Sequence, residues 1–254
     1  ERISRIDVTG TLLTMRRWET HIRSLSRSGG GSTQPGGIRK LYPDLSTQHY
    51  IRLLITVLFS FITSAILIYP EKFQMVMFPF SALGRKFTPS GLQNIYARIV
   101  FDAGMFLCGY TMYLLARYYS RKHPVPDAPI YEFLSYISAA GFFLMMAPCD
   151  VPEVRFLHSI GSGFVVGSHF FMASIRIMAV QQHMKRWSLY ILLTILISSV
   201  LFYALLWFFE LPYHPLFQKP AFAAIIYVEL RGSTLSRFLG ERKVRLSLQS
   251  QQLH

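Results

Sequence analysis

Residues 78–119 read FPFSALGRKFTPSGLQNIYARIVFDAGMFLCGYTMYLLARYY, and this stretch is the clearest indication of the protein's architecture. Its first part is a polar loop that contains prolines and glycines, which interrupt regular structure. The rest, residues 95–119, is apolar and longer than the roughly 20 residues that an α-helix needs to cross a bilayer. The stretch therefore predicts a loop that leads directly into a transmembrane helix.

Two charged residues, Arg98 and Asp102, lie inside this apolar segment. They are four residues apart, so a helix places them on one face, where they can pair. Charges inside a span are costly and are usually paired, turned toward the bundle interior or functional. The pair is therefore interpreted either as an ion pair that fixes the rotation of the helix or as part of a polar pocket under loop 78–94.

The composition of the whole chain indicates a membrane protein. Of its 254 residues, 52% are hydrophobic and only 15% are charged, whereas soluble domains carry about 25% charged residues. The formal net charge is +13. The basic residues flank several apolar segments instead of forming one stripe, which is typical of positive-inside topology and argues against nucleic-acid binding.

Six apolar segments predict an all-α, polytopic transmembrane bundle. They are residues 51–69, 95–119, 131–147, 156–180, 188–209 and 216–239. The sixth is the weakest, because Glu229 and Arg231 lie inside it, and a half-helix along the membrane surface is the alternative. Alternate loops are rich in Lys and Arg, so both termini are expected on the cytoplasmic side. The sequence does not identify the membrane.

The chain is expected to have three parts. Residues 1–37 combine a basic amphipathic segment with a Gly/Ser linker, which lies on a membrane surface, docks on a partner or stays disordered. Residues 38–230 are the bundle, and residues 231–254 are a basic tail. The two cysteines, Cys108 and Cys149, are expected at different membrane depths and therefore as free thiols.

Polar residues predict a pocket at the outer face of the bundle. The candidates are Arg98, Asp102, Asp150, Glu153 and His158. Two acids and a histidine can serve acid–base chemistry on a lipid head group. The alternative is a solvated loop beside a helix N-terminus, where negative charge is favourable. The spacing matches no metal site, and no metal is predicted.

The fourth apolar segment carries two further features. His169 lies deep in it and is interpreted as a hydrogen-bonded packing residue, with a proton relay or an axial ligand to haem or chlorophyll as the alternatives. Ser159, Gly163 and Gly167 form a small-xxx-small row, which favours close helix packing.

Three short stretches carry a resemblance to a known group of proteins. They are FPFSALG in the first outer loop, NIYARIVFDAG at the start of the second span and APCDVPEVRFLHSIGSGFVVG at the start of the fourth. In these stretches and in topology, residues 50–228 resemble the six-span Frag1/DRAM/Sfk1-type proteins and the related DUF998-like bacterial membrane proteins. The resemblance implies a six-helix bundle with a structured first outer loop and a histidine, here His158, opening the fourth span. Some of these proteins are linked to lipid or GPI-anchor handling and to membrane trafficking.

The absence of sequence motifs for catalysis shapes the functional prediction. The chain has no nucleophile elbow, P-loop, HExxH or dinucleotide fingerprint. The first hypothesis is therefore a non-catalytic scaffold or accessory subunit, with other membrane subunits and membrane lipids as partners. The alternative is a lipid-handling protein with its pocket under loop 78–94, and a weaker one is a pigment- or haem-binding subunit through His169. No cofactor is predicted, a bound lipid is expected, and no nucleic-acid partner is expected.

Overall fold

The computed structural model describes residues 45–121, 127–181, 185–209, 211 and 215–231. Across these residues the chain is helical, with one isolated β-bridge between Phe87 and Gln93 in a loop. All of them belong to one compact unit, Arg39–His254. The predictions for segment 1–37 and for the tail after Arg231 lie outside the described residues.

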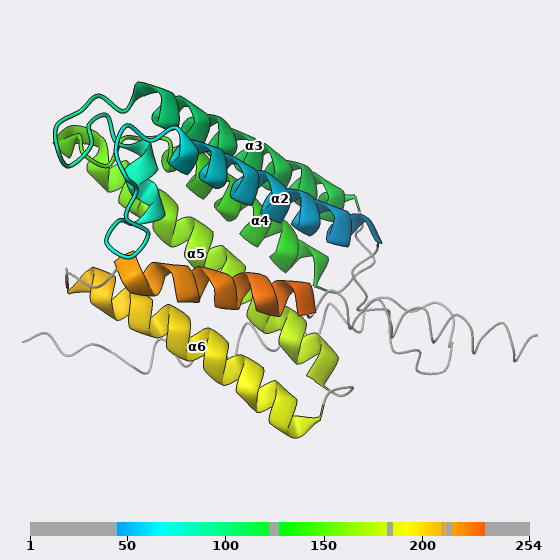
Figure 1. The fold of residues 1–254 in the computed structure, drawn as a ribbon. Helices are drawn as coiled ribbons and strands as arrows, with labels where there is room; N and C mark the ends of the chain where they lie inside the picture. The colour runs from blue at the N-terminus through cyan, green and yellow to red at the C-terminus, as the bar shows by residue number, and fades with distance from the viewer. Residues whose placement is uncertain (1–44, 122–126, 182–184, 210, 212–214, 232–254) are drawn as a thin grey trace, which may run out of the picture. The chain divides into compact units, whose positions relative to one another are not determined.

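Five long helices overlap the first five predicted apolar segments, and a further helix overlaps the described part of the sixth (Figure 1). In chain order, the helices are α2 (Leu45–Leu67), the short 3₁₀ helix η1 (Phe80–Gly84), α3 (Ile95–Ser120), α4 (Ala128–Leu144), α5 (Pro152–Val180), α6 (Arg186–Phe208) and a last helix over residues 215–231. A proline lies in the first turn of both α4 and α5. Proline is favoured there because its missing N–H has no partner in a helix anyway.

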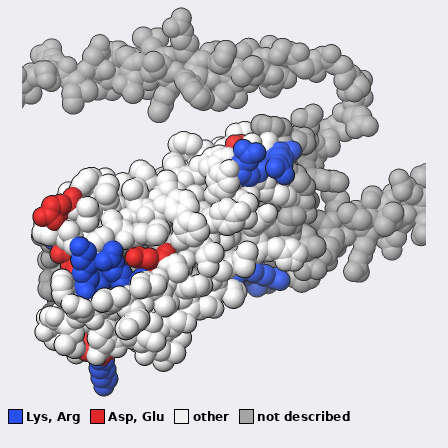
Figure 2. Space-filling view, turned by 90° about the horizontal axis from the view of Figure 1, so that it is seen from above, with Lys and Arg blue, Asp and Glu red and all other residues white. Residues whose placement is uncertain are grey.

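Four of the helices in the described part are long and apolar enough to cross a membrane. These segments are Thr47–Leu67, Ile95–Ser120, Pro152–Ala179 and Arg186–Phe208. Helix α4 is apolar but has only 17 residues. On the face that Figure 2 shows, an uncharged band separates the charged side chains near one end from those farther along. The helices are therefore compatible with an integral membrane protein by length and composition.

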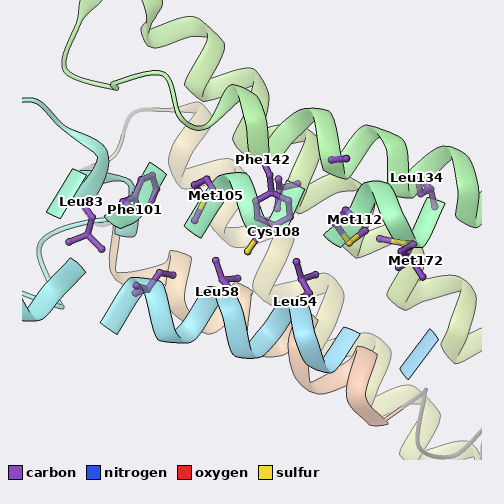
Figure 3. Close-up of a cluster of buried hydrophobic side chains, with 14 of the residues drawn as sticks. Leu54, Leu58, Leu83, Phe101, Met105, Cys108, Met112, Leu134, Phe142 and Met172 are labelled. Carbon is purple, nitrogen blue, oxygen red and sulfur yellow. The ribbon is translucent and has the colours of Figure 1, made fainter. Parts of the chain in front are cut away.

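Two clusters of buried apolar side chains form the interior. In the first, α3 packs against both α2 and α4, and α4 packs against α5. Figure 3 shows Leu54 and Leu58 facing the row that Met105, Cys108 and Met112 form along α3. The second cluster lies between α5, α6 and the 215–231 helix. Cys108 is buried in the first cluster, and both cysteines are free thiols, as predicted.

The predicted packing row of Ser159, Gly163 and Gly167 is not where the helices meet most closely. A Cβ added at Gly163 or Gly167 would meet no described atom within 4 Å. The close approach is between Gly141 of α4 and Gly161 of α5, where a Cβ on Gly161 would lie 2.6 Å from the Gly141 carbonyl oxygen. The sequence pattern was correct in expecting small residues on α5, but the face that packs is the one with Gly161.

Gly161→Ala is expected to destabilise the bundle, because the added methyl group has to push two helix backbones apart. Overpacking of this kind costs about 1–3 kcal/mol. The matched control is Gly163→Ala on the same helix, where an added methyl group meets open space. Thermal unfolding in detergent should show a lower Tm for Gly161→Ala only. Equal Tm values for the two variants would contradict the helix contact.

Candidate functional site

Loop 68–94 is folded back on itself and held by a buried asparagine. The side chain of Asn94 donates hydrogen bonds from Nδ2 to the carbonyl oxygens of Leu83, at 2.9 Å, and Arg85, at 3.1 Å. Its backbone N–H donates to the carbonyl oxygen of Lys86 at 2.9 Å. Asn94 is fully buried. One side chain thus fixes η1 against the start of α3, and this end of the bundle is called the loop end below.

Asp150 connects a second loop, residues 145–151, to loop 68–94 by hydrogen bonds. Its Oδ2 accepts hydrogen bonds from the backbone N–H groups of Lys86, at 2.8 Å, and Phe87, at 2.9 Å. The Cys149 thiol donates to the Ser81 carbonyl oxygen at 3.4 Å. A carboxylate that accepts two backbone N–H groups makes charge-assisted bonds, which are stronger than neutral ones. Asp150 therefore has a structural role whatever else it does.

A cavity of about 610 Å³ lies beside these two loops. It is called the loop-end cavity, and its polar lining comes from loop 68–94, loop 145–151, α5, α6 and the 215–231 helix. The polar residues are Ser81, Arg85, Cys149, Asp150, Arg155, His158, Ser159, Ser162, Tyr203 and Gln218. Two of the five predicted pocket residues, Asp150 and His158, thus share one cavity.

His158 presents a free ring nitrogen at this site. Its Nδ1 lies 2.9 Å from the carbonyl oxygen of Ala147. A carbonyl oxygen can only accept, so Nδ1 carries the proton and Nε2 of the neutral ring has a lone pair. Nε2 is buried and has no hydrogen-bond partner among the described residues. The backbone bond holds the ring in one orientation, which leaves Nε2 as an acceptor for a ligand.

The cations of the loop-end cavity are Arg85 and Arg155. Arg155 is exposed, whereas Arg85 is half-buried and its Nε has no partner in the described part. Burial raises the pKa of the Cys149 thiol, and the nearby Arg85 guanidinium opposes this only in part. The cavity therefore contains two guanidinium groups, a neutral thiol, the acceptor nitrogen of His158 and the Asp150 carboxylate, whose Oδ2 is already bonded to two backbone N–H groups.

Arg98 and Asp102 lie on a different cavity. The predicted pair is present, with Arg98 Nε 3.5 Å from Asp102 Oδ2. Both residues line a pocket of about 370 Å³ on the side of α3, together with Lys86 and Asn94. The structure does not bring them together with Asp150 and His158, because residues 85–87 lie between the two cavities. Glu153 is exposed and lines neither of them.

Two smaller apolar cavities lie next to one another inside the bundle, and the first of them adjoins the loop-end cavity. The first, of about 60 Å³, shares Tyr203 and Gln218 with the loop-end cavity. The second, of about 30 Å³, shares Phe142 with the first and is also lined by His169 and Glu229. Together they are called the interior cavities. Their shared walls form a row that leads from the loop-end cavity to His169.

Both ring nitrogens of His169 already have protein partners. Nδ1 lies 3.0 Å from Glu229 Oε1, and Nε2 lies 3.1 Å from Ser138 Oγ. Ligation of a haem or chlorophyll by this ring would require one of these bonds to break. The described residues contain no group of three or more His, Cys, Asp and Glu side chains placed to hold a metal ion. The packing interpretation of His169 matches these contacts.

Sequence reasoning did not identify Arg85 or Ser138 as site residues. Arg85 is one basic residue in a polar loop, and Ser138 is one serine in an apolar segment, so neither carries a local signal. Glu229 did carry a signal, since a carboxylate inside an apolar segment is rare and often functional. Its partner on another helix was beyond what spacing along one segment can show.

Comparison of the chain with protein-family models, with curated proteins and with solved structures gives no match. The assignment of function therefore depends on the geometry of the site.

The raised pKa of Cys149 predicts slow alkylation near neutral pH. Only the thiolate reacts, and an ordinary cysteine has a pKa of about 8.5. Because the pKa is raised, the alkylation rate should still be increasing above pH 9. Arg85→Gln should slow the reaction further at pH 8, since it removes the cation that favours the thiolate. Mass spectrometry of the Cys149 peptide measures the rate, and the same protein unfolded in denaturant is the control. A plateau below pH 8.5 would contradict the assignment.

Proposed function

We propose that the chain is a multi-pass membrane protein that binds a membrane lipid, with the head group in the loop-end cavity and the start of an acyl chain directed toward the interior cavities. The observation that supports this proposal is that the polar loop-end cavity shares lining residues with an apolar cavity. Ligand sites typically combine an apolar lining with a few placed polar groups. A membrane lipid likewise has a polar head group at one end and apolar acyl chains at the other.

The charges of the loop-end cavity favour an anionic head group. Guanidinium groups bind phosphate with parallel hydrogen bonds, and Arg85 Nε has a donor without a partner. His158 Nε2 supplies an acceptor next to them, so a phosphate that also carries a hydroxyl or ammonium donor satisfies both kinds of group. The lipid-handling proteins that the sequence resembles are consistent with this proposal.

The accessory-subunit hypothesis stays a prediction. It depends mainly on the basic segments before residue 38 and after residue 230, which are almost wholly outside the described residues. Neutral substitution at Asp150 does not separate it from lipid binding, because Asp150 holds two backbone amides of loop 68–94. A residue with no such structural bond is needed for the test.

The proposed topology has six spans, with both termini on the cytoplasmic side. The sixth span begins with the 215–231 helix, which packs against α5 and α6 in the second apolar cluster. The loop end carries Glu71, Asp150 and Glu153 beside Lys72, Arg85, Lys86, Arg155 and Lys219. The opposite end has a larger excess of cations, with Arg52, Arg117, Arg121, Lys185, Arg186 and Arg231 beside Asp127 and Glu132. This distribution of charge supports a loop end that faces away from the cytoplasm.

Arg155→Gln is expected to weaken the binding of an anionic phospholipid about tenfold or more, because a hydrogen bond to a charged group contributes about 1.5–3 kcal/mol. Native mass spectrometry of detergent-solubilised protein, titrated with phosphatidylglycerol and with phosphatidylcholine, measures the affinity. Arg186→Gln is the matched control, since Arg186 is also exposed but begins α6 at the opposite end. Equal affinities for the two variants, or no preference for the anionic lipid, would overturn the proposal.

The topology is tested by cysteine labelling in intact cells. Glu153 and Gln181 are exposed residues at the two ends of α5. In a background without native cysteines, a membrane-impermeant maleimide should label Glu153→Cys and should label Gln181→Cys only after the cells are lysed. The reverse result would show the opposite orientation of the bundle.

A further inference from the structure

The structure joins a serine, a histidine and a glutamate in one hydrogen-bonded chain inside the bundle. Ser138 Oγ lies 3.1 Å from His169 Nε2, and His169 Nδ1 lies 3.0 Å from Glu229 Oε1. The three residues come from α4, α5 and the 215–231 helix. All three are buried, with relative exposures of 0%, 8% and 3%. We propose that Ser138 is the nucleophile, His169 the base and Glu229 the positioning residue of a site that transfers or hydrolyses acyl groups.

The hydrogen-bond partners of His169 show which of its ring nitrogens carries a proton and which accepts one. The ionised carboxylate of Glu229 can only accept, so Nδ1 of the ring donates to it. Nε2 then has a lone pair that accepts the Ser138 hydroxyl. This is the arrangement by which a histidine removes the proton of a serine while a carboxylate holds the ring in the right tautomer. Nucleophile and base lie within hydrogen-bond reach, as activation requires.

A buried cation balances the charge of the carboxylate. Arg176 is 4% exposed, interacts electrostatically with Glu229, and lies over the ring of Tyr131 with its Cζ 5.5 Å from the centroid. An unpaired buried charge would be strongly unfavourable. Arg176 therefore allows Glu229 to stay ionised, so that it can accept from an imidazole that becomes positively charged during the reaction.

The two serines of α4, Ser135 and Ser138, have different side-chain partners. Ser135 is also fully buried, but its hydroxyl contacts Met172 Sδ at 3.9 Å, which is a weak acceptor. Ser138 is the serine on this helix that meets a base. A substitution at Ser135 therefore tests the effect of changing a buried serine of α4 without touching the hydrogen-bonded chain.

The interior cavities reach the base and the carboxylate of this site, whereas Ser138 lines neither of them. The deeper one is lined by His169 and Glu229, and Phe142 lines both of them. Phe142 lies one turn from Ser138 and meets the His169 ring edge-on, with centroids 6.3 Å apart. An acyl carbonyl that arrives from the loop-end cavity has to displace this ring to reach Ser138. The choice of a lipid acyl ester as substrate rests on the proposed function, whereas the assignment of the nucleophile does not.

The proposed reaction has two steps, acylation of Ser138 and then deacylation. Ser138 Oγ forms a bond to the acyl carbon while its proton passes to His169 Nε2; the ester C–O bond breaks, and the leaving alkoxide takes that proton and departs as an alcohol. Water, or a second alcohol, then attacks the acyl-serine and gives its proton to Nε2. The C–Oγ bond breaks, and Nε2 returns the proton to Ser138.

Labelling of the full-length protein with an alkyl fluorophosphonate tests the proposal. This probe bonds covalently to an activated serine with loss of fluoride, which a serine that only packs does not support. We expect a mass increase on the peptide that contains Ser138, its loss in Ser138→Ala, and unchanged labelling in Ser135→Ala. Glu229→Gln should lower the maximal labelling rate at least about hundredfold without changing the probe concentration at half-maximal rate. Thermal unfolding of each variant checks that it is folded.

The possible results of these experiments distinguish the acyl-transfer site from the proposed lipid-binding site. A folded wild-type protein whose Ser138 is not labelled overturns the acyl-transfer site, even if anionic lipid binds. Labelling that persists in Ser138→Ala, or that Ser135→Ala abolishes, overturns it as well. Labelling of Ser138 by a short-chain probe, together with lipid affinity that is insensitive to Arg155→Gln, retains the nucleophile and rejects the lipid site.

Discussion

The hydrogen bond between His169 and Glu229 is the interaction on which the second half of the bundle depends. A carboxylate inside an apolar segment has no water to solvate it, so its helix is stable in the bundle only where donors from other helices meet it. His169 supplies such a donor, and Arg176, two turns away on α5, interacts electrostatically with the same carboxylate. Their presence explains how residues 215–231 can be both charged and buried, and it brings Ser138 of α4 into contact with the same ring.

The loop end follows from a different constraint, which is the need to satisfy backbone groups in a segment without regular structure. Asn94 and Asp150 supply the partners that a helix would have supplied internally. Since both act on residues 83–87, they make this part of the chain rigid and hold Arg85 at the wall of the loop-end cavity. The hydrogen bonds of Asn94 and Asp150 therefore both order the loop and position Arg85 at the loop-end cavity.

The helices were predictable from the sequence because each apolar segment is a local property of the chain. The Arg98–Asp102 pair was predictable for the same reason, as both partners lie on one face of one helix.

The sites were only partly predictable. Asp150 and His158 were recognised as polar residues near a membrane face, but their separation from Arg98 depends on how residues 85–87 pass between two cavities. The contacts of Ser138 and Glu229 with His169 join residues distant in sequence, and no period along the chain encodes them. Gly161 was missed because Gly163 and Gly167 fit the expected spacing equally well, and only the rotation of α5 decides which glycine faces α4.

Helix α4, with 17 residues, spans about 25 Å, which is shorter than the roughly 30 Å hydrocarbon core of a typical bilayer. Its neighbours α3 and α5 are considerably longer. The extra length lies at the end away from the loops, because loop 145–151 leads directly into α5 at Pro152 and Asp150 is bonded to Lys86 and Phe87 just before α3. A bilayer that adapts to the shorter α4 becomes locally thinner, so the protein should partition toward thinner membranes.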